Sequence, residues 1–251
     1  MKKRIDLLLV EKKNISSRNK AQAMIMAGQV YVENKKVLKS GELCEINADI
    51  VKANLHPQWV SRGALKLLYA FENFNIDVKD SICLDLGAST GGFTEVLLSK
   101  KAKKIYAVDV GTNQLHEKLR KQIKVVNISK TNARYLSKNI VRDTINVIVC
   151  DVSFISMKKV IEPCLQFLEK ENGIVIGLIK PQFEASKNEI QKGGVILDSE
   201  IHTRICKDFS EWFSSKCKMK VQGITPSPIK GPKGNIEFLI YAKNNYKKRK
   251  Q

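Results

Sequence analysis

One segment constrains the fold of this chain more than any other, because it joins an apolar run to an amphipathic helix through a glycine turn. It reads ICLDLGASTGGFTEVLL, where the run Ile82–Leu86 breaks at Gly87 and helical spacing resumes from Phe93. A strand, turn and helix of this kind bring the backbone close to a ligand. The glycine spacing is neither G-x-G-x-x-G nor a phosphate loop ending in Gly-Lys-Ser/Thr, so a dinucleotide pyrophosphate is not the favoured ligand.

Acidic residues near this turn indicate which ligand it holds. The next apolar run, IYAVDV, contains Asp109 at its end, and this carboxylate could accept both hydroxyls of a ribose. Asp85, inside the first segment, adds a negative charge that suits a sulfonium or an ammonium group. Together these features predict S-adenosylmethionine as the cofactor. The alternative is a purely structural glycine turn, and Asp109 at the strand end argues against it.

Strand and helix patterns alternate along most of the chain. The runs ICLDL, KIYAVDV, KVVNIS, INVIVCD and GIVIGLIK read as strands with helices between them, which predicts a parallel sheet covered on both faces. The late runs MKVQGITPS and IEFLIYAK are joined by a short loop, so the last strand should be antiparallel to its neighbour. The predicted fold class is therefore α/β, with a Rossmann-like sheet that ends in an antiparallel strand.

A smaller unit precedes this sheet. It combines a helical stripe of Ile5, Leu8 and Leu9 with a second helix from Arg18 to Ala27 and short alternating segments that read as strands. The motifs RIDLLL and SSRNKAQAMIMAGQVYVENKKV resemble the S4 RNA-binding module, a small α+β fold; a generic helical hairpin is the alternative. The basic residues that we predict to contact RNA, including one beyond this unit, are Arg4, Arg18, Lys20, Lys35, Lys36 and Arg62.

Breaks in the pattern divide the chain into four parts. Residues 1–55 form the S4-like unit, and the segment HPQWV interrupts the pattern, which predicts a linker over residues 56–60. Residues 61–244 form the catalytic α/β domain, and the basic run KKRKQ lies in a tail over residues 245–251. We expect a monomer.

Composition indicates a nucleic-acid partner. The formal net charge of +19 is large for 251 residues, and a polyanionic partner is its commonest cause; lysine-rich solvated faces are the alternative. No apolar run approaches the roughly 20 residues of a membrane helix, and the N-terminus does not read as a signal peptide, so we expect a cytoplasmic protein without a membrane partner. Six cysteines without a C-x-x-C pair read as reduced core thiols, and three histidines without ligand spacing as surface or hinge residues, so no metal is predicted.

Four charged residues from distant segments should meet at one edge of the sheet. Asp151 and Lys180 end the strands INVIVCD and GIVIGLIK, and ligands of parallel sheets sit at the carboxyl ends of strands. Glu237 begins the antiparallel last strand, so it lies at the same edge. Lys66 is near the start of the helix that feeds the first strand, and such a helix begins at that edge as well.

Two amines and two carboxylates suit the transfer of a methyl group from a sulfonium to a weakly acidic alcohol. A lysine has a pKa of about 10.4, which a second ammonium group and partial desolvation can lower by several units. We assign Lys180 as the general base, Lys66 as the charge that stabilises the alkoxide, Asp151 as the residue that orients Lys180, and Glu237 as the residue that holds Lys66. A structural cluster of salt bridges is the alternative.

The motifs SRGALKL, LDLGASTGGFTEVLL, AVDVG, CDVSFIS, LIKPQFE and GNIEFL resemble the TlyA family over essentially the whole chain. Members are called haemolysins but are ribosomal-RNA ribose methyltransferases, with an S4 module fused to an FtsJ/RrmJ-like class I methyltransferase domain. The resemblance implies cytidine 2′-O-methylation in ribosomal RNA by a Lys-Asp-Lys-Glu tetrad that falls on Lys66, Asp151, Lys180 and Glu237. The residues it implies for cofactor binding, with our additions, are Asp85, Gly87, Ser89, Thr90, Gly91, Gly92, Phe93, Asp109, Asn132 and Asp151.

Two residues depart from the family pattern. Leu65 stands where a histidine is expected before the lysine, and Asn132 stands where related enzymes often have an aspartate near the adenine. Members of the family modify ribosomal RNA either in the large subunit alone or in both subunits. The chain is short for the family, which favours the type that acts on the large subunit alone.

Three other functions compete with this interpretation. An NAD-dependent oxidoreductase would also use a doubly wound sheet and Asp109, but the dinucleotide fingerprint is missing. A membrane-active haemolysin would need an apolar or amphipathic membrane segment, which the sequence does not show. A catalytically idle ribosome-assembly factor would bind RNA in the same way, and only loss of methylation without loss of RNA binding distinguishes the enzyme from it.

Overall fold

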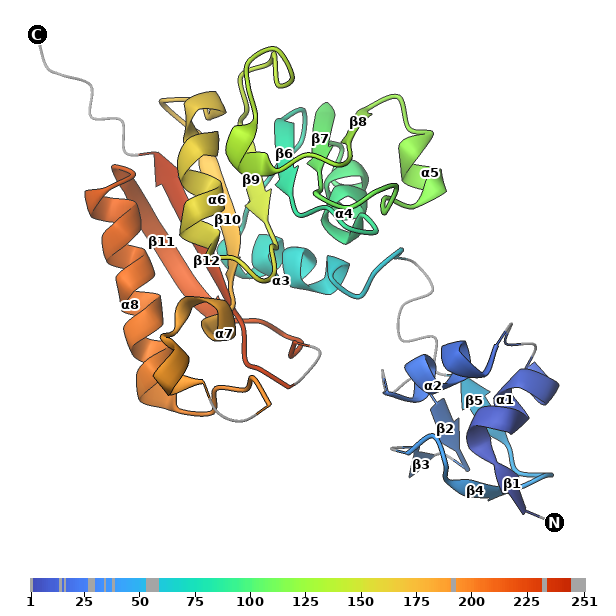
Figure 1. Cartoon of the computed structure of the whole chain (residues 1–251). Helices are drawn as coiled ribbons and strands as arrows, with labels where there is room; N and C mark the ends of the chain where they lie inside the picture. The colour runs from blue at the N-terminus through green and yellow to red at the C-terminus, as the bar shows by residue number, and fades with distance from the viewer. Residues whose placement is uncertain are drawn as a thin grey trace, which may run out of the picture. The chain divides into compact units, whose positions relative to one another are not determined.

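The chain forms two compact units, residues 1–58 and 59–251 (Figure 1). The computed structural model describes residues 2–13, 15, 17–26, 30–33, 35–37, 39–52, 59–190, 193–231 and 234–244. Of the predicted linker, residues 56–58 lie outside the described residues, while Trp59 and Val60 belong to the second unit. The predicted tail, residues 245–251, also lies outside them.

The N-terminal unit packs two helices against short strands. Its apolar core contains Ile5, Leu8 and Leu9 from the predicted stripe, together with Ile25 and Val30. β1 pairs with β4, and β2 lies between β3 and β5 in a second antiparallel sheet. The elements are β1 Lys2–Arg4, α1 Ile5–Lys13, α2 Arg18–Met26, β2 Val30–Val32, β3 Lys35–Lys36, β4 Leu43–Glu45 and β5 Ile50–Lys52. The pattern did not predict β1, because Lys-Lys-Arg lacks apolar alternation.

A seven-stranded sheet organises the second unit, and it confirms the predicted fold class. The strand order is β11-β12-β10-β9-β6-β7-β8, and β12 is antiparallel to both of its neighbours, β10 and β11. The pairs among β10, β9, β6, β7 and β8 are parallel. The strands are β6 Ile82–Leu86, β7 Lys104–Val108, β8 Val125–Ile128, β9 Val147–Cys150, β10 Ile174–Ile179, β11 Met219–Pro226 and β12 Phe238–Asn244.

Helices cover both faces of this sheet, as Figure 1 shows. Apolar side chains of α6 and α8 pack on one face, and those of α3, α4 and α5 pack on the other. Along β9, Ile148 and Cys150 point to the first face while Val147 and Val149 point to the second, as the two-residue repeat of a strand requires. The helices are α3 Ala64–Phe74, α4 Gly92–Ser99, α5 Glu117–Arg120, α6 Met157–Cys164, α7 Pro181–Glu184 and α8 Ser199–Ser215, with 3-10 turns at Ala133–Tyr135, Leu165–Phe167 and Lys187–Glu189.

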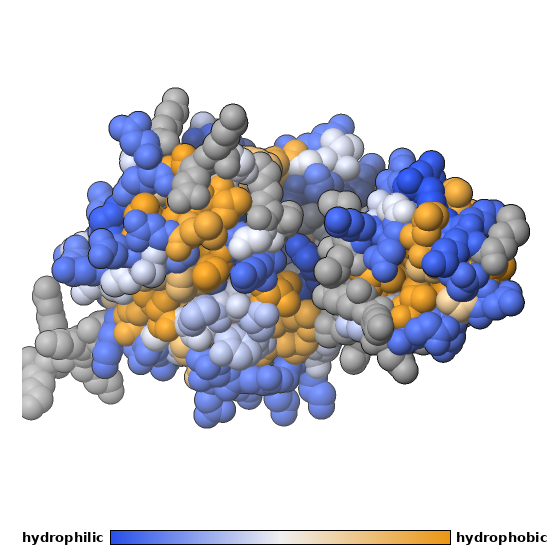
Figure 2. Space-filling view, turned by 90° about the horizontal axis from the view of Figure 1, so that it is seen from below, coloured by the Kyte–Doolittle hydropathy of each residue, from blue (hydrophilic) through white to orange (hydrophobic). Residues whose placement is uncertain are grey.

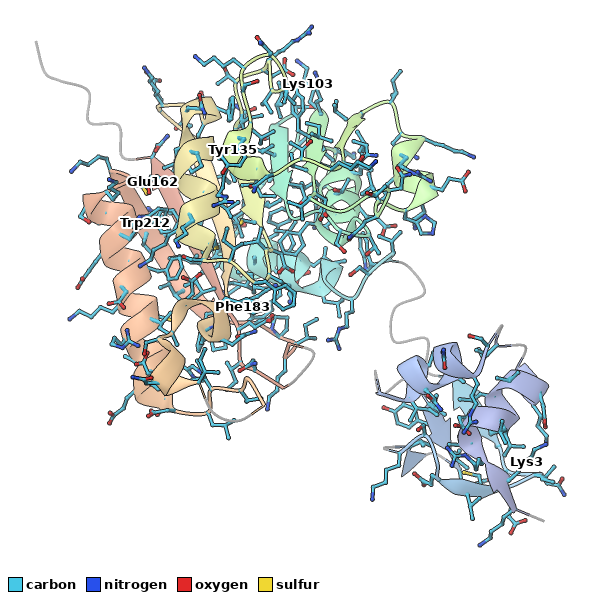
Figure 3. All side chains as sticks on the ribbon, in the orientation of Figure 1. Lys3, Lys103, Tyr135, Glu162, Phe183 and Trp212 are labelled. Carbon is cyan, nitrogen blue, oxygen red and sulfur yellow. The ribbon has the colours of Figure 1, made fainter. Side chains whose placement is uncertain are left out.

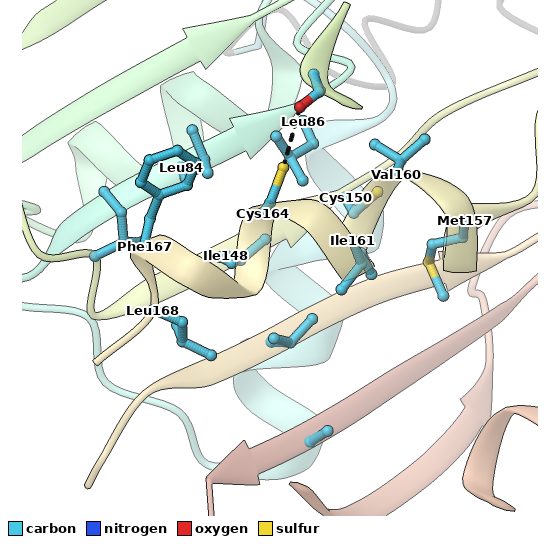
Figure 4. Close-up of a cluster of buried hydrophobic side chains, with 14 of the residues drawn as sticks. Leu84, Leu86, Ile148, Cys150, Met157, Val160, Ile161, Cys164, Phe167 and Leu168 are labelled. Atoms are coloured by element: carbon cyan, nitrogen blue, oxygen red, sulfur yellow. Dashed lines mark hydrogen bonds between the residues drawn. The ribbon is translucent and has the colours of Figure 1, made fainter. Parts of the chain in front are cut away.

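Buried thiols belong to this core. All six cysteines are free, and Cys150 at the end of β9 and Cys164 at the end of α6 are fully buried among apolar side chains (Figure 4). The Cys164 thiol donates a hydrogen bond to the Ala133 carbonyl oxygen at 3.4 Å, and burial raises its pKa to about 12. A thiol with so high a pKa is chemically inert, which agrees with a packing role.

The histidine prediction was wrong for one residue. His202 on α8 is buried, since its Nε2 lies 3.2 Å from the Ile196 carbonyl oxygen and its ring packs edge-on against Phe238. His116 is exposed, and its Nδ1 accepts a hydrogen bond from the Lys118 backbone at the start of α5. His56 lies outside the described residues.

Within the described ranges, no helix is long and apolar enough to cross a membrane.

Candidate active site

The four predicted charged residues come from the ends of four separate elements. Asp151 directly follows β9, and Lys180 directly follows β10. Glu237 directly precedes β12, whose first residue Phe238 pairs with Ile179, so Glu237 and Lys180 leave the sheet at the same edge. Lys66 lies in the first turn of α3. The topology therefore places all four residues at one edge, as the sequence predicts.

Their side chains form a continuous chain of ion pairs. Lys66 Nζ donates a hydrogen bond to Glu237 Oε2 at 2.6 Å and lies 3.6 Å from Asp151 Oδ2. Lys180 Nζ lies 2.5 Å from Asp151 Oδ1 and also donates to Ser153 Oγ at 2.9 Å. Asp151 thus bridges the two amines, while Glu237 contacts Lys66.

Three members of the cluster are almost sealed from solvent, while the Asp151 side chain is 19% exposed. Lys66 is 7% exposed, Lys180 8% and Glu237 1%. Buried charges of this kind persist only when each has an opposite partner, because desolvation of an isolated charge is costly. Two amines and two carboxylates satisfy that condition.

Two adjoining cavities open beside the cluster. The larger, about 390 Å³, is lined at its polar side by Gly87, Ser89, Asp109, Asn132 and Asp151. The smaller, about 190 Å³, reaches Lys180, and the predicted cofactor residues that line it are Gly87, Ser89, Thr90, Gly92, Phe93 and Asp151. Eight of the ten predicted cofactor residues therefore face one cavity or both.

Gly87 shapes the wall that the two cavities share. Its φ is +82°, and a Cβ atom there would lie 2.7 Å from the Asp151 carbonyl oxygen, so only glycine fits. The conformation lets the loop pass close over the strand ends, which leaves room for a ligand to approach the backbone.

Asp109 holds the glycine loop as well as facing the larger cavity. One carboxylate oxygen accepts the Ser89 backbone N–H at 2.8 Å, and the other accepts the Gly111 N–H at 2.7 Å. Each carboxylate oxygen has a second lone pair, so both can still accept a hydroxyl of a ribose. Asn132 uses its Oδ1 to accept the Arg134 backbone N–H at 3.1 Å, which sets the orientation of its amide.

Two predicted cofactor residues line neither cavity. Asp85 is 1% exposed beneath α4, where the Thr94 hydroxyl donates to its Oδ2 at 2.6 Å. Burial raises the pKa of Asp85 to about 7, with the nearby Asp151 charge acting in the same direction. Gly91 has a φ of +99°, and a Cβ atom there would lie 2.2 Å from the Leu119 side chain, so this glycine serves helix packing.

The predicted RNA-binding residues have different surroundings. Arg62 is exposed just before α3. The side chains of Lys20, Lys35 and Lys36 lie outside the described residues. Arg4 and Arg18 both contact Asp6, a partner that the sequence did not indicate.

Sequence reasoning also missed residues at the mouth of the site. Ser153 follows Asp151 by two residues, faces both cavities and contacts Lys180. Phe154 is 91% exposed with a φ of +65°, and its ring lies 5.1 Å from that of Phe183, which projects from α7 (Figure 3). The aromatic residue four positions after the strand end, in CDVSFIS, is the signal that could have identified Phe154. Figure 2 shows apolar areas, in orange, between the polar areas, in blue, on the surface of the chain.

The sheet order, the glycine turn and the polar strand ends define a class of proteins, the doubly wound methyltransferases. Residues 59–244 match the FtsJ-like methyltransferase family, and residues 3–50 match the S4 domain. This chain belongs to the FtsJ-like methyltransferase family and, within it, to the TlyA- and hemolysin-named proteins, which confirms the predicted resemblance.

Similar proteins cover nearly the whole chain. Hemolysin A of Brachyspira hyodysenteriae is 45% identical over 90% of this chain and 93% of its own length. The 16S/23S rRNA (cytidine-2′-O)-methyltransferase TlyA of Mycobacterium tuberculosis is 37% identical over 95% and 88%. The 23S rRNA (cytidine-2′-O)-methyltransferase TlyA of Campylobacter jejuni is 34% identical over 95% and 98%. Among solved structures, a hemolysin-named protein of Streptococcus thermophilus has a TM-score of 0.76 at 36% identity, covering 97% of this chain and 88% of its own.

Proposed function

We propose that this chain transfers a methyl group from S-adenosylmethionine to the ribose 2′-hydroxyl of a cytidine in ribosomal RNA. The observation that carries the proposal is the buried chain Glu237, Lys66, Asp151, Lys180, which lies beside two cavities at the carboxyl edge of a methyltransferase sheet. Two relatives that are similar over almost the full chain are named rRNA (cytidine-2′-O)-methyltransferases, which supports cytidine in ribosomal RNA as the acceptor.

The residues around the larger cavity fit an adenosine group. Asp109 keeps acceptor capacity for ribose hydroxyls, Asn132 offers an amide to the adenine, and Gly87 lets the ligand approach the loop backbone. Ser89, Thr90, Gly92 and Phe93 would enclose the amino-acid part in the smaller cavity. When bound, S-adenosylmethionine supplies a methyl group on a positively charged sulfur. With Lys180 neutral, the cluster carries one positive and two negative charges, which complements that sulfonium.

The cluster divides the work of proton removal. Lys180, in its neutral form, takes the proton of the ribose 2′-hydroxyl, and Asp151 holds the amine in position through the 2.5 Å contact. Lys66, fixed by Glu237 at 2.6 Å, keeps its positive charge near the developing alkoxide. The enclosed site strengthens these interactions because water is largely excluded. Positioning and electrostatics therefore supply the catalysis.

RNA binding falls to the basic surfaces. The S4-like unit, residues 1–55, would bind an RNA helix by shape and phosphate contact through Arg4, Arg18, Lys20, Lys35 and Lys36. Arg62, in the catalytic unit, would contact a phosphate as well. A flipped-out nucleotide would then reach the catalytic cluster of residues 61–244. We propose the large ribosomal subunit as the favoured substrate, with the protein acting as a monomer in the cytoplasm.

One experiment tests both the reaction and the acceptor. Purified protein is incubated with methyl-tritiated S-adenosylmethionine and separated ribosomal subunits, and the RNA is digested to nucleosides. We expect label in 2′-O-methylcytidine from the large subunit, with no label from Lys180→Ala and full label from Lys159→Ala, a matched exposed lysine on α6. Label on a base, or no label on either subunit or on naked RNA, would contradict the proposal.

The S4 match at residues 3–50 also supports a second candidate, an RNA-binding assembly factor without catalysis. The same assay separates the two functions. RNA binding with no methylation by the unmodified protein would favour the assembly factor.

A further inference from the structure

The N-terminal unit contains a buried carboxylate whose partners are two arginines. Asp6, at the start of α1, is 0% exposed. Its Oδ1 accepts Arg4 Nε at 3.1 Å, and its Oδ2 accepts Arg4 Nη2, Arg18 Nε and Gln22 Nε2, each at 3.0 Å. Arg4 ends β1, while Arg18 and Gln22 lie four residues apart on one face of α2. Asp6 thus joins the two halves of the unit through polar contacts.

This arrangement fixes two guanidinium groups side by side. Both arginines contact the same oxygen, so their planar groups must be neighbours, although each carries a positive charge. Asp6 neutralises only one of these charges. The Arg4 hydrogen bonds hold the pKa of Asp6 well below its usual range, with Gln22 and Arg18 acting in the same direction, so the carboxylate stays ionised.

Among the described residues, most donors of the two arginines have no protein acceptor. A guanidinium group has five N–H bonds, of which Arg4 directs two and Arg18 one toward Asp6. The Arg4 side chain is 41% exposed and the Arg18 side chain 50%, so both side chains also face solvent. Gly41 leaves space for the Arg4 group, since a Cβ atom there would lie 3.2 Å from Arg4 Nη1.

We propose that Asp6 is a positioning residue that holds Arg4 and Arg18 as a preformed receptor for a backbone phosphate of RNA. The planar forks of two neighbouring guanidinium groups match the oxygens of a phosphodiester. Because Asp6 restrains both side chains before RNA arrives, binding loses less conformational freedom than it would with two mobile arginines. This inference rests on the proposed RNA substrate and adds the residue that organises its capture.

The competing explanation is that net charge alone governs RNA binding, and it predicts the opposite change in RNA affinity for Asp6→Asn. Asp6→Asn makes the protein more positive by one charge, so a purely electrostatic surface would bind RNA more tightly. A preformed receptor would bind RNA more weakly, because the asparagine can no longer accept two charge-assisted forks. We expect about tenfold weaker binding, which corresponds to roughly 1.4 kcal/mol.

The test measures the affinity of the full-length protein for ribosomal RNA by filter binding over a series of salt concentrations. Glu11→Gln is the matched control, since it removes the same charge from an exposed carboxylate that pairs with Lys3. We expect Asp6→Asn to weaken binding and reduce the salt slope by about one, while Glu11→Gln leaves the affinity unchanged or slightly tighter. Equal or tighter binding by Asp6→Asn, with an unchanged circular dichroism spectrum, would overturn the inference.

A second variant decides the matter if Asp6→Asn unfolds the N-terminal unit. Arg18→Lys keeps the charge but loses the planar fork, so we expect about threefold weaker binding, whereas Lys3→Arg should leave the affinity unchanged. Unchanged affinity in Arg18→Lys would overturn the receptor. Methylation by the unmodified protein separates failure of this inference from failure of the proposed enzyme. Loss of that methylation would overturn the enzyme, whereas methylation together with unchanged affinity in Arg18→Lys would overturn only the receptor.

Discussion

Both units of this chain contain a carboxylate that holds two basic side chains, but the surroundings of the two carboxylates are opposite. In the catalytic unit, Asp151 contacts Lys66 and Lys180, whose side chains are only 9% exposed. In the N-terminal unit, Asp6 contacts Arg4 and Arg18, whose side chains are 41% and 50% exposed. Lysine can lose its proton and serve as a base, whereas arginine stays charged and offers several donors. A carboxylate that holds two buried lysines therefore suits acid–base catalysis, and one that holds two exposed arginines suits anion binding.

Asp85 is another buried carboxylate, and its pKa shifts in the opposite direction to that of Asp6. Asp6 and Asp85 are both buried, at 0% and 1% exposure. Hydrogen bonds from Arg4 keep the pKa of Asp6 low, with Gln22 and Arg18 acting in the same direction. Burial raises the pKa of Asp85 to about 7, although Thr94 bonds its carboxylate. Burial and charged partners together therefore determine whether a buried carboxylate carries a charge.

Asp151→Asn should have the largest effect, because it removes the partner of both buried lysines. We expect the methyl-transfer rate to fall by about 10³-fold or more, while RNA affinity stays within about twofold of the unmodified protein. Single-turnover rates and filter binding measure the two quantities. If Asp151→Asn weakened RNA binding but left the transfer rate unchanged, the assignment of the buried lysine cluster to catalysis and of the exposed arginine pair to RNA binding would be wrong.

Glu237→Gln should have the next largest effect. The amide cannot balance the charge of Lys66, so we expect the transfer rate to fall by about 10²-fold and the unit to lose on the order of 2–4 kcal/mol of stability. Replacing both partners, in Lys66→Met with Glu237→Met, should recover much of the stability but none of the activity. Urea unfolding of the single and double variants measures this coupling, and additive losses would show that the pair is not coupled.

Asp85→Asn should remove a pH dependence of stability. The folded pKa of about 7 lies above the unfolded value near 3.8, so the folded state binds more protons between these values. The unfolding free energy of the unmodified protein should therefore fall as pH rises from about 4 to 7, and the variant should be more stable at pH 8 by on the order of 2–4 kcal/mol.

Asp143→Asn is the control for this titration. Hydrogen bonds from Lys104 and Tyr106 lower the pKa of Asp143, so its contribution to stability is already complete above the unfolded value and is lost only at lower pH. Its stability difference from the unmodified protein should be flat from pH 5 to 8. A flat difference for Asp85→Asn as well would show that Asp85 is ionised in the folded state.

Ser153→Ala should have the smallest effect. It removes the hydroxyl that accepts from Lys180 at 2.9 Å, so we expect the transfer rate to fall by about three- to tenfold without a change in RNA affinity. Ser153→Thr keeps the hydroxyl and should restore most of the rate. Equal rates for Ser153→Ala and the unmodified protein would show that Ser153 does not position the amine.

The edge of the sheet at which the charged residues meet could be predicted from the sequence. Lys66, Asp151, Lys180 and Glu237 lie at element ends, and the order of strands and helices fixes which ends share an edge. Not every side-chain partner could be predicted in this way, because a pattern gives the edge but not the direction of each side chain. The bond from Lys180 to Ser153 and the contact between Lys66 and Asp151 are of that kind.

Asp85 and Asp6 show two other limits of the sequence. Asp85 lies between Leu84 and Leu86 within β6, so its side chain points to the sheet face under α4 and not to the strand end. The two-residue repeat of a strand was sufficient to predict that the Asp85 side chain points to a face of the sheet. Asp6 gave no such signal, because its partners Arg18 and Gln22 are more than ten residues away and belong to another helix.

The most direct test of the central claim compares Lys180→Ala with Lys159→Ala in single-turnover methyl transfer to bound ribosomal RNA. We predict a loss of at least about 10²-fold for Lys180→Ala, with RNA and S-adenosylmethionine affinities retained and Lys159→Ala unaffected. A rate for Lys180→Ala within a few-fold of the unmodified protein would contradict the role of Lys180 as the base.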